Sequence, residues 1–121
     1  MKLKMDFWNR LEKLIEENEI MIDRPKGSTH PKFDNFTFPL DYGYLKNTSS
    51  NDGNEIDIWK GSLISTQLIA IACTVDSMKK DSEIKLFVGC SSDEIEILID
   101  FYDNNMYMSG MFINNPLYKT P

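Results

Sequence analysis

The segment Asp52-Gly53-Asn54-Glu55-Ile56-Asp57-Ile58 combines a tight turn with the start of a β-strand and carries a carboxylate at each end. Gly53 lets the backbone turn sharply, so Asp52 and Asp57 can face one cavity. Carboxylate oxygens suit Mg²⁺ or Mn²⁺, which often bridge to substrate phosphate. A simple turn between two strands explains the same residues. The rest of the chain has to decide between a turn and a cation site.

Composition bounds the classes of protein to which the chain can belong. The 121 residues predict a single domain over 1–121, and 41% hydrophobic residues suffice for one core. The net charge of −6 argues against a nucleic-acid partner, because there is no basic stripe to contact phosphates. The longest apolar run, residues 68–73, is too short to cross a bilayer, so we expect no membrane association.

The two cysteines and the N-terminal residues indicate the compartment. Residues 1–10 contain Lys2 and Lys4 but no apolar stretch behind them, which is not the pattern of a signal peptide. Cys73 and Cys90 have no metal-type spacing, so we expect two reduced thiols. A cytoplasmic location follows from these two observations.

Hydrophobic periodicity predicts two helices and several short strands. Helical spacing extends over residues 5–18, with Phe7, Leu11, Leu14 and Ile15 on one face, and a second helix begins at Ser91 or Ser92 and ends near residues 104–105. Strand patterns cover residues 19–23, 32–38, 42–45, 55–59, 66–75, 83–88 and 106–113. This order predicts an α+β, mainly β fold: a small antiparallel β-barrel with an N-terminal and a C-terminal flanking helix.

The segment 52–58 resembles the signature of the soluble inorganic pyrophosphatases, and six of its seven positions agree with that signature. Three other blocks resemble this family and occur in the family's order: residues 22–28 with 32–34, residues 38–48, and Asp76 and Asp81 followed by Lys85. The resemblance spans residues 19–89. It implies an OB-like barrel with an acidic pocket that binds Mg²⁺, or alternatively Mn²⁺, together with phosphate.

The resemblance also assigns roles to individual residues. It implies Mg²⁺ ligands at Asp52, Asp57, Asp76 and Asp81, and Glu83 competes with Asp81 because two extra residues precede Lys85. It implies substrate phosphate contacts at Lys32, Lys85, Tyr42, Asp23 and Asp34. The catalytic candidates are Asp57, Asn54 and Tyr42.

Several positions depart from the family pattern. Asn54 stands where the family has an aspartate that binds metal and helps to form the attacking hydroxide, and an amide cannot accept that proton. Phe38 replaces a tyrosine, and Asp23 and Asp34 replace glutamates. The segment between Asp34 and Phe38 is short and lacks the arginine that the family uses to hold phosphate.

Two functions are consistent with these residues. The first is Mg²⁺-dependent hydrolysis of pyrophosphate or a related small diphosphate by metal-activated water. The second is a pyrophosphatase-like module that binds a phosphorylated ligand or a protein partner without turnover. The retained carboxylates and lysines favour hydrolysis, and Asn54 favours the binding module. The Phe7-Trp8 pair leaves a homo-oligomeric contact open.

Overall fold

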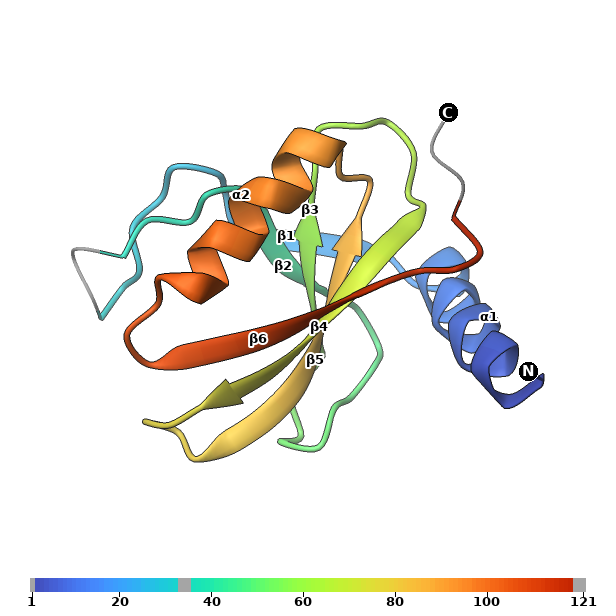
Figure 1. Cartoon of the computed structure of the whole chain (residues 1–121), viewed down its shortest axis with the longest axis horizontal. Helices are drawn as coiled ribbons and strands as arrows, with labels where there is room; N and C mark the ends of the chain where they lie inside the picture. Colours follow the sequence, from blue (N-terminus) through green and yellow to red (C-terminus); the bar gives the residue numbers. More distant parts are fainter. Residues whose placement is uncertain (1, 33–35, 119–121) are drawn as a thin grey trace.

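The computed structural model describes residues 2–32 and 36–118. It contains two helices and six strands (Figure 1). In chain order these are α1 (Lys2–Glu17), β1 (Ile20–Arg24), β2 (Asp41–Leu45), β3 (Ile56–Lys60), β4 (Leu68–Asp76), β5 (Asp81–Val88), α2 (Ser92–Asp103) and β6 (Met108–Asn114).

The strands form one sheet in the order β1-β2-β3-β5-β4-β6. All neighbours are antiparallel except β3 and β5, because β4 lies beyond β5 and the β4–β5 hairpin returns β5 alongside β3 in the same direction. The expected α+β, mainly β fold with two flanking helices is confirmed. The sheet is open and mixed rather than closed and antiparallel, since β1 and β6 end it and pair only with β2 and β4 in the described chain.

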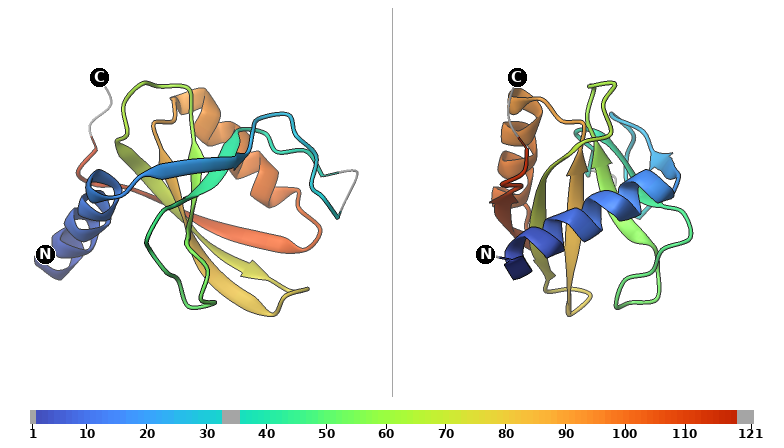
Figure 2. Two further views of the ribbon diagram at one scale, coloured as in Figure 1. Left: turned by 180° about the vertical axis from the view of Figure 1, so that it is seen from behind. Right: turned by 90° about the vertical axis from the view of Figure 1, so that its right-hand side faces the viewer.

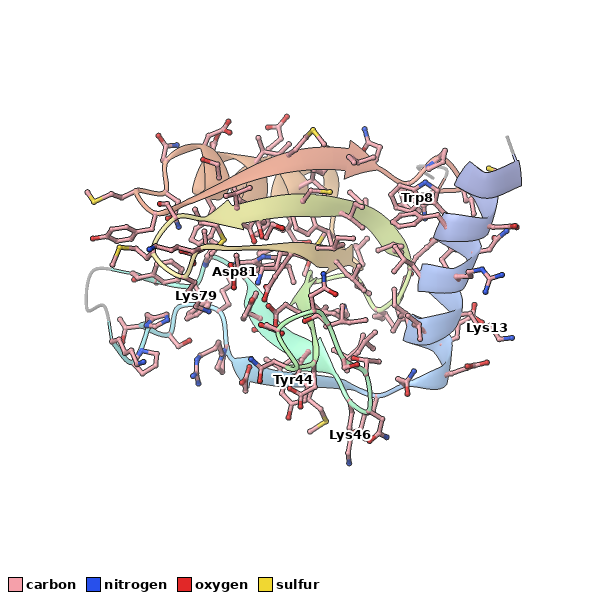
Figure 3. The ribbon with its side chains drawn as sticks, turned by 90° about the horizontal axis from the view of Figure 1, so that it is seen from below. Trp8, Lys13, Tyr44, Lys46, Lys79 and Asp81 are labelled. Atoms are coloured by element: carbon pink, nitrogen blue, oxygen red, sulfur yellow. The ribbon has the colours of Figure 1, made fainter. Side chains whose placement is uncertain are left out.

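The two helices cover opposite faces of the sheet, as the two turned views in Figure 2 show. Leu98 and Tyr102 of α2 pack in one core with Trp59 and Phe87. Trp8 and Ile15 of α1 pack in the other core with alternate residues of the same strands. Trp8 turns toward the sheet and Lys13 away from it (Figure 3). Trp8, 2% exposed, is the buried aromatic side chain of α1, whereas Phe7, expected on the packed face, is 39% exposed.

The helix α2 begins with a capping box, as Ser91 predicts. Glu94 N donates to Ser91 Oγ at 3.2 Å, and Ser91 N donates to Glu94 Oε1 at 2.9 Å. The Glu94 carboxylate also accepts a hydrogen bond from Ser62 N at 3.0 Å. The start of α2 is therefore tied to the segment between β3 and β4.

The strand expected at residues 32–38 is not formed by its described part. Only an isolated bridge joins Thr29 and Thr37, and residues 33–35 lie outside the described chain. Phe38 N donates to Ser28 O, and His30 N donates to Phe36 O. The facing segment 25–31 carries proline at both ends, which lack N–H groups, so the ladder cannot extend.

Candidate functional site

One face of the sheet divides into an apolar half and a polar half. Trp59 and Phe87 lie side by side in the parallel β3–β5 register, under α2. Two residues earlier on each strand, the side chains on this face are Asp57 and Lys85. Further toward the start of β5 the same face carries Glu83 and Asp81, because alternate residues share a side. Asp57, Lys85, Glu83 and Asp81 thus form a polar row on this face, which lies next to the apolar half and beyond the end of α2.

Lys85 is the buried centre of this row. It is 5% exposed, and its Nζ atom donates to Tyr42 OH at 3.0 Å, to Glu83 Oε2 at 2.6 Å and to Asp57 Oδ2. Burial by itself lowers the pKa of Lys85, but the charges and hydrogen bonds of Tyr42, Asp57 and Glu83 outweigh it and hold that pKa above its usual range. Lys85 is therefore a fixed positive charge.

Tyr42 connects Lys85 to the aromatic core. Its ring stacks on Phe38 with the ring centroids 5.4 Å apart, and its centroid lies 4.6 Å from that of the Trp59 ring. Lys85 Nζ lies 5.7 Å from the centroid of the Tyr42 ring. Burial raises the pKa of Tyr42 above its usual range, which keeps the phenol protonated. The Tyr42 hydroxyl can donate a hydrogen bond at this position.

Asp52, Asp81 and Glu83 form a cluster of carboxylates, with one oxygen from each within 4.8 Å of the others. Burial, and then the hydrogen bond to Asp52, raise the pKa of Glu83. Hydrogen bonds from Glu83, Ser50 and the Asn54 amide lower the pKa of Asp52. The pKa values of the two neighbouring carboxyl groups are therefore shifted in opposite directions, upward for Glu83 and downward for Asp52. Three neighbouring carboxylates repel one another, and such an all-oxygen donor set fits a divalent cation, which removes that repulsion.

The loop before β3 fixes the orientation of Asp52. Ser50 Oγ and Asn54 N donate to Asp52 Oδ1 at 2.8 and 2.9 Å, and Gly53 adopts a φ of +85° between them. Asn54 Nδ2 lies 3.4 Å from Asp52 Oδ2. Asn54 is exposed, and its side-chain amide points to the Asp52 carboxylate. Ser50 was not expected to contribute; its position two residues before Asp52 is the signal that could have shown it.

Asp76 lies opposite Asp81 in the β4–β5 register. It is 9% exposed, and its Oδ1 atom accepts hydrogen bonds from Met78 N at 2.9 Å and Lys79 N at 3.0 Å. One oxygen of Asp76 thus closes the turn between β4 and β5. This turn carries Lys79 to the same end of the molecule as Asp81 (Figure 3).

The remaining expected residues lie on the rim or outside the described chain. Lys32 is exposed in the loop before β2, where its backbone N donates to His30 Nδ1 at 3.0 Å. Asp23 is exposed on β1, next to the register shift at Ile22/Arg24. Asp34 lies outside the described residues. Within the described residues, neither Lys32 nor Asp23 forms a hydrogen bond or ion pair with the carboxylate cluster.

The fold is shared with inorganic pyrophosphatases of known structure. A structure described as an inorganic phosphatase from Anaplasma phagocytophilum aligns with a TM-score of 0.56 and 13% identity, over 78% of this chain and 82% of that one. The inorganic pyrophosphatase of Helicobacter pylori aligns with a TM-score of 0.52 and 16% identity, over 81% of this chain and 77% of that one. The inorganic pyrophosphatase of Coxiella burnetii aligns with a TM-score of 0.51 and 13% identity, over 78% of this chain and 84% of that one.

At these identities the likeness shows the fold alone, and the chain has a pyrophosphatase-like fold. No protein-family model and no curated protein matches it. In the described residues, neither helix has the length and apolar character needed to span a membrane.

Proposed function

We propose that this protein hydrolyses inorganic pyrophosphate or a related small diphosphate in a Mg²⁺-dependent reaction. The observation that carries the proposal is the cluster of Asp52, Asp81 and Glu83 beside the buried Lys85, on one face of a pyrophosphatase-like fold. A carboxylate cluster can attract cations without any substrate, and a lysine can hold phosphate without chemistry. Their combination on one sheet face suits a phosphoanhydride that arrives with its cation.

Asp52, Asp81 and Glu83 are the residues that would hold Mg²⁺ or Mn²⁺, with Asp57 and Asp76 completing the acidic surroundings. When bound, such a cation neutralises phosphate charge and lowers the pKa of a coordinated water. Because burial raises the pKa of Glu83, protons compete with the cation for this ligand as the pH falls. Asp57, half-buried and paired with Lys85, would accept a proton beside the cluster.

Lys85 and Tyr42 would hold phosphoryl oxygens at the inner end of the site. Lys85 contributes a buried charge and Tyr42 a protonated hydroxyl, and both are fixed before any ligand arrives. Lys32, exposed in the loop before β2, would contact the outer phosphate, and the sequence resemblance adds Asp23 and Asp34 as residues of the phosphate-binding set. The two unpaired thiols, Cys73 and Cys90, suit a cytoplasmic protein.

Asn54 favours a second candidate function, cation-dependent binding of a phosphorylated ligand without turnover. Its amide donates toward Asp52 Oδ2 at 3.4 Å, so it supplies a donor where a base would be needed. The pocket could then retain phosphate affinity while it lacks one proton acceptor.

The experiment that separates the two functions measures phosphate release from pyrophosphate with Mg²⁺, with Mn²⁺ and with EDTA. The matched pair of variants is Asp81→Asn, which removes one carboxylate of the cluster, and Glu96→Gln, which removes an exposed carboxylate of α2. Hydrolysis predicts cation-dependent release that Asp81→Asn abolishes and Glu96→Gln leaves intact.

A cation-dependent rise in melting temperature without phosphate release from any small diphosphate would instead support the binding module. If the chain shows no phosphate release and no cation effect on the melting temperature, both functions are contradicted.

A further inference from the structure

The edge strand β6 is built to accept another strand, unlike the opposite edge. The edge strand β1 contains Asp23 and Arg24 and has a register shift between Ile22 and Arg24, features that discourage strand addition. β6 (Met108–Asn114) contains no charged residue and no proline, and its register with β4 is unbroken over all seven residues. The sheet therefore has one protected edge and one unprotected edge.

The direction of the β6 backbone groups follows from its hydrogen bonds to β4. Ser77 N donates to Tyr107 O and Asn115 N donates to Ile69 O, each at 3.0 Å. The backbone N–H and C=O groups of the odd-numbered residues of this segment therefore point toward β4. The backbone N–H and C=O groups of the even-numbered residues point away from β4, to the open edge. Asn105 Oδ1 accepts from Met108 N at 3.0 Å, but the N–H groups of Gly110, Phe112 and Asn114 have no acceptor within the described chain.

The surroundings of this edge are apolar on both sheet faces. On the α1 face, beyond the part that α1 covers, Met111 is 61% exposed and Val75 of the neighbouring strand is 59% exposed. On the α2 face a cavity of about 280 Å³ lies between α2 and β6, lined among others by Ile99, Tyr102, Gly110 and Phe112. Both surfaces reach the open edge.

We propose that two copies of this chain associate through β6, as an antiparallel strand pair with its two-fold axis at Met111. In this register Gly110 faces Phe112 of the second copy and Met108 faces Asn114, so all outward-facing residues of both strands lie opposite one another. A second copy fits because antiparallel pairing about a two-fold axis matches a strand with itself. β6 is also a charge-free stretch of a chain with net charge −6, so like charges do not meet in the strand pair.

The side chains on both faces suit this register. Met111 lies directly opposite its own copy in a non-hydrogen-bonded pair, where the Cα atoms are about 4.5 Å apart, so two exposed methionines become buried together. Gly110 has no side chain above the sheet, and a Cβ there would lie 3.2 Å from the Tyr102 ring. Phe112 of the second copy, beside Gly110 on the same face, lies at the cavity and can fill it.

Sedimentation of the full chain over a range of concentrations tests the association. We expect a monomer–dimer equilibrium with a Kd on the order of micromolar, because one strand pair makes a small interface. Met111→Glu sets two like charges opposite each other and should weaken the dimer at least about tenfold. Val75→Glu adds the same charge at a similarly exposed position on the same face, one strand inward, and should change the Kd much less. A wild-type chain that stays monomeric, or that forms open-ended oligomers, would overturn the proposal.

Cysteine crosslinking tests the register. In a Cys73→Ala background, which removes the half-buried thiol opposite Met111 on β4, Met111→Cys should form an intermolecular disulfide upon mild oxidation. Ser109→Cys lies opposite Ile113 of the second copy in the proposed register, so it should crosslink far less. Equal crosslinking of the two variants, or a Met111→Cys chain that does not crosslink, would overturn this register. None of these measurements depends on hydrolytic activity.

Discussion

Glu83 Oε2 lies 2.6 Å from Lys85 Nζ, two residues further along the same face of β5. The same carboxyl group is hydrogen-bonded to Asp52 from the loop before β3. Glu83 thus joins the buried positive charge of Lys85 to the exposed Asp52 within the carboxylate cluster. Lys85 neutralises part of this acidic site, and the opposite pKa shifts of Glu83 and Asp52 give the site a dependence on pH and on cations.

The first prediction concerns pH in the absence of divalent cations. Burial and the Asp52 contact raise the pKa of Glu83 above its ordinary 4.5 in the folded chain. The stabilisation from its proton is therefore complete below pH 4.5 and is lost as the pH rises through the folded pKa. Asp52 acts oppositely: its lowered pKa gives a stabilisation that is present above its ordinary 3.8 and lost at lower pH. With EDTA present, we expect the Glu83 contribution to the free energy of unfolding to decline as the pH rises above 4.5 and through the raised pKa.

Glu83→Gln keeps a hydrogen-bond donor for Asp52 and removes the titration. In urea unfolding at several pH values, this variant should lose the decline, whereas Glu96→Gln on the exposed side of α2 should retain it. Mg²⁺ competes with protonation of Glu83, whose pKa is raised, so in the wild-type chain the rise in melting temperature with Mg²⁺ should be larger at about pH 8 than at about pH 5.5. A Mg²⁺ effect that does not vary with pH would contradict this competition between Mg²⁺ and protons at Glu83.

The second prediction concerns Lys85. Lys85→Met keeps an unbranched side chain of similar length but removes the charge between Asp57 and Glu83. Removing one partner of a buried ion pair leaves the other uncompensated, and since Asp57 is partly exposed we expect a loss of about 2–4 kcal/mol in the free energy of unfolding. Lys79→Met, in the exposed turn, is the matched control and should change it by less than about 0.5 kcal/mol.

Divalent cations should restore part of the stability lost in Lys85→Met, because they replace the missing positive charge. Chemical denaturation with and without Mg²⁺ measures both effects. If Lys85→Met is as stable as Lys79→Met, the buried charge is not needed to neutralise the carboxylates.

The third prediction concerns Gly43 in β2. A Cβ atom at this position would lie 1.7 Å from Met21 O, inside the backbone of β1. Gly43→Ala must therefore displace β1, and we expect a loss of more than about 3 kcal/mol in the free energy of unfolding. Gly53→Ala meets no atom within 4 Å and is strained only by its φ of +85°, so it should cost roughly 1–2 kcal/mol. Thermal unfolding of both variants compares them, and equal losses would contradict the steric explanation.

The sequence predicted much of the fold because local patterns dominate there. The β-propensity of residues 83–88 and the capping residue Ser91 predicted β5 and α2 to within one or two residues of their bounds. Sheet closure was not predictable from such patterns, because the partners of β1 and β6 depend on contacts distant in sequence. The segment 32–38 alternates like a strand, but its facing segment contains Pro25 and Pro31 and provides few donors.

The site was predictable where the spacing of residues along one strand determines which face they share. Asp81, Glu83 and Lys85 alternate on β5, so their common face follows from the sequence alone. The choice between Asp81 and Glu83 as cluster members could not be made that way, and the structure includes both. The hydrogen bonds of Asp76 to its own turn and of Glu83 to Asp52 depend on loop conformations for which the sequence carries no periodic signal.

The last prediction concerns Asn54. Asn54→Asp replaces an amide that donates toward Asp52 Oδ2 with a carboxylate, which adds negative charge beside the cluster and supplies a proton acceptor. Without cations the variant should be less stable, and the rise in melting temperature with Mg²⁺ should be larger than in the wild-type chain. If the site hydrolyses pyrophosphate, phosphate release should rise by roughly 10²–10⁴-fold, the usual range for a general base.

Asn51→Asp is the matched control, because it adds the same charge in the same exposed loop without a hydrogen bond to Asp52 among those of the described residues. It should change neither phosphate release nor the Mg²⁺ effect by more than about twofold. An increase in Mg²⁺ binding by Asn54→Asp without any gain in phosphate release favours the binding module. Absence of phosphate release in both the wild-type chain and Asn54→Asp, with Mg²⁺ binding established for each, would rule out pyrophosphate hydrolysis at this site.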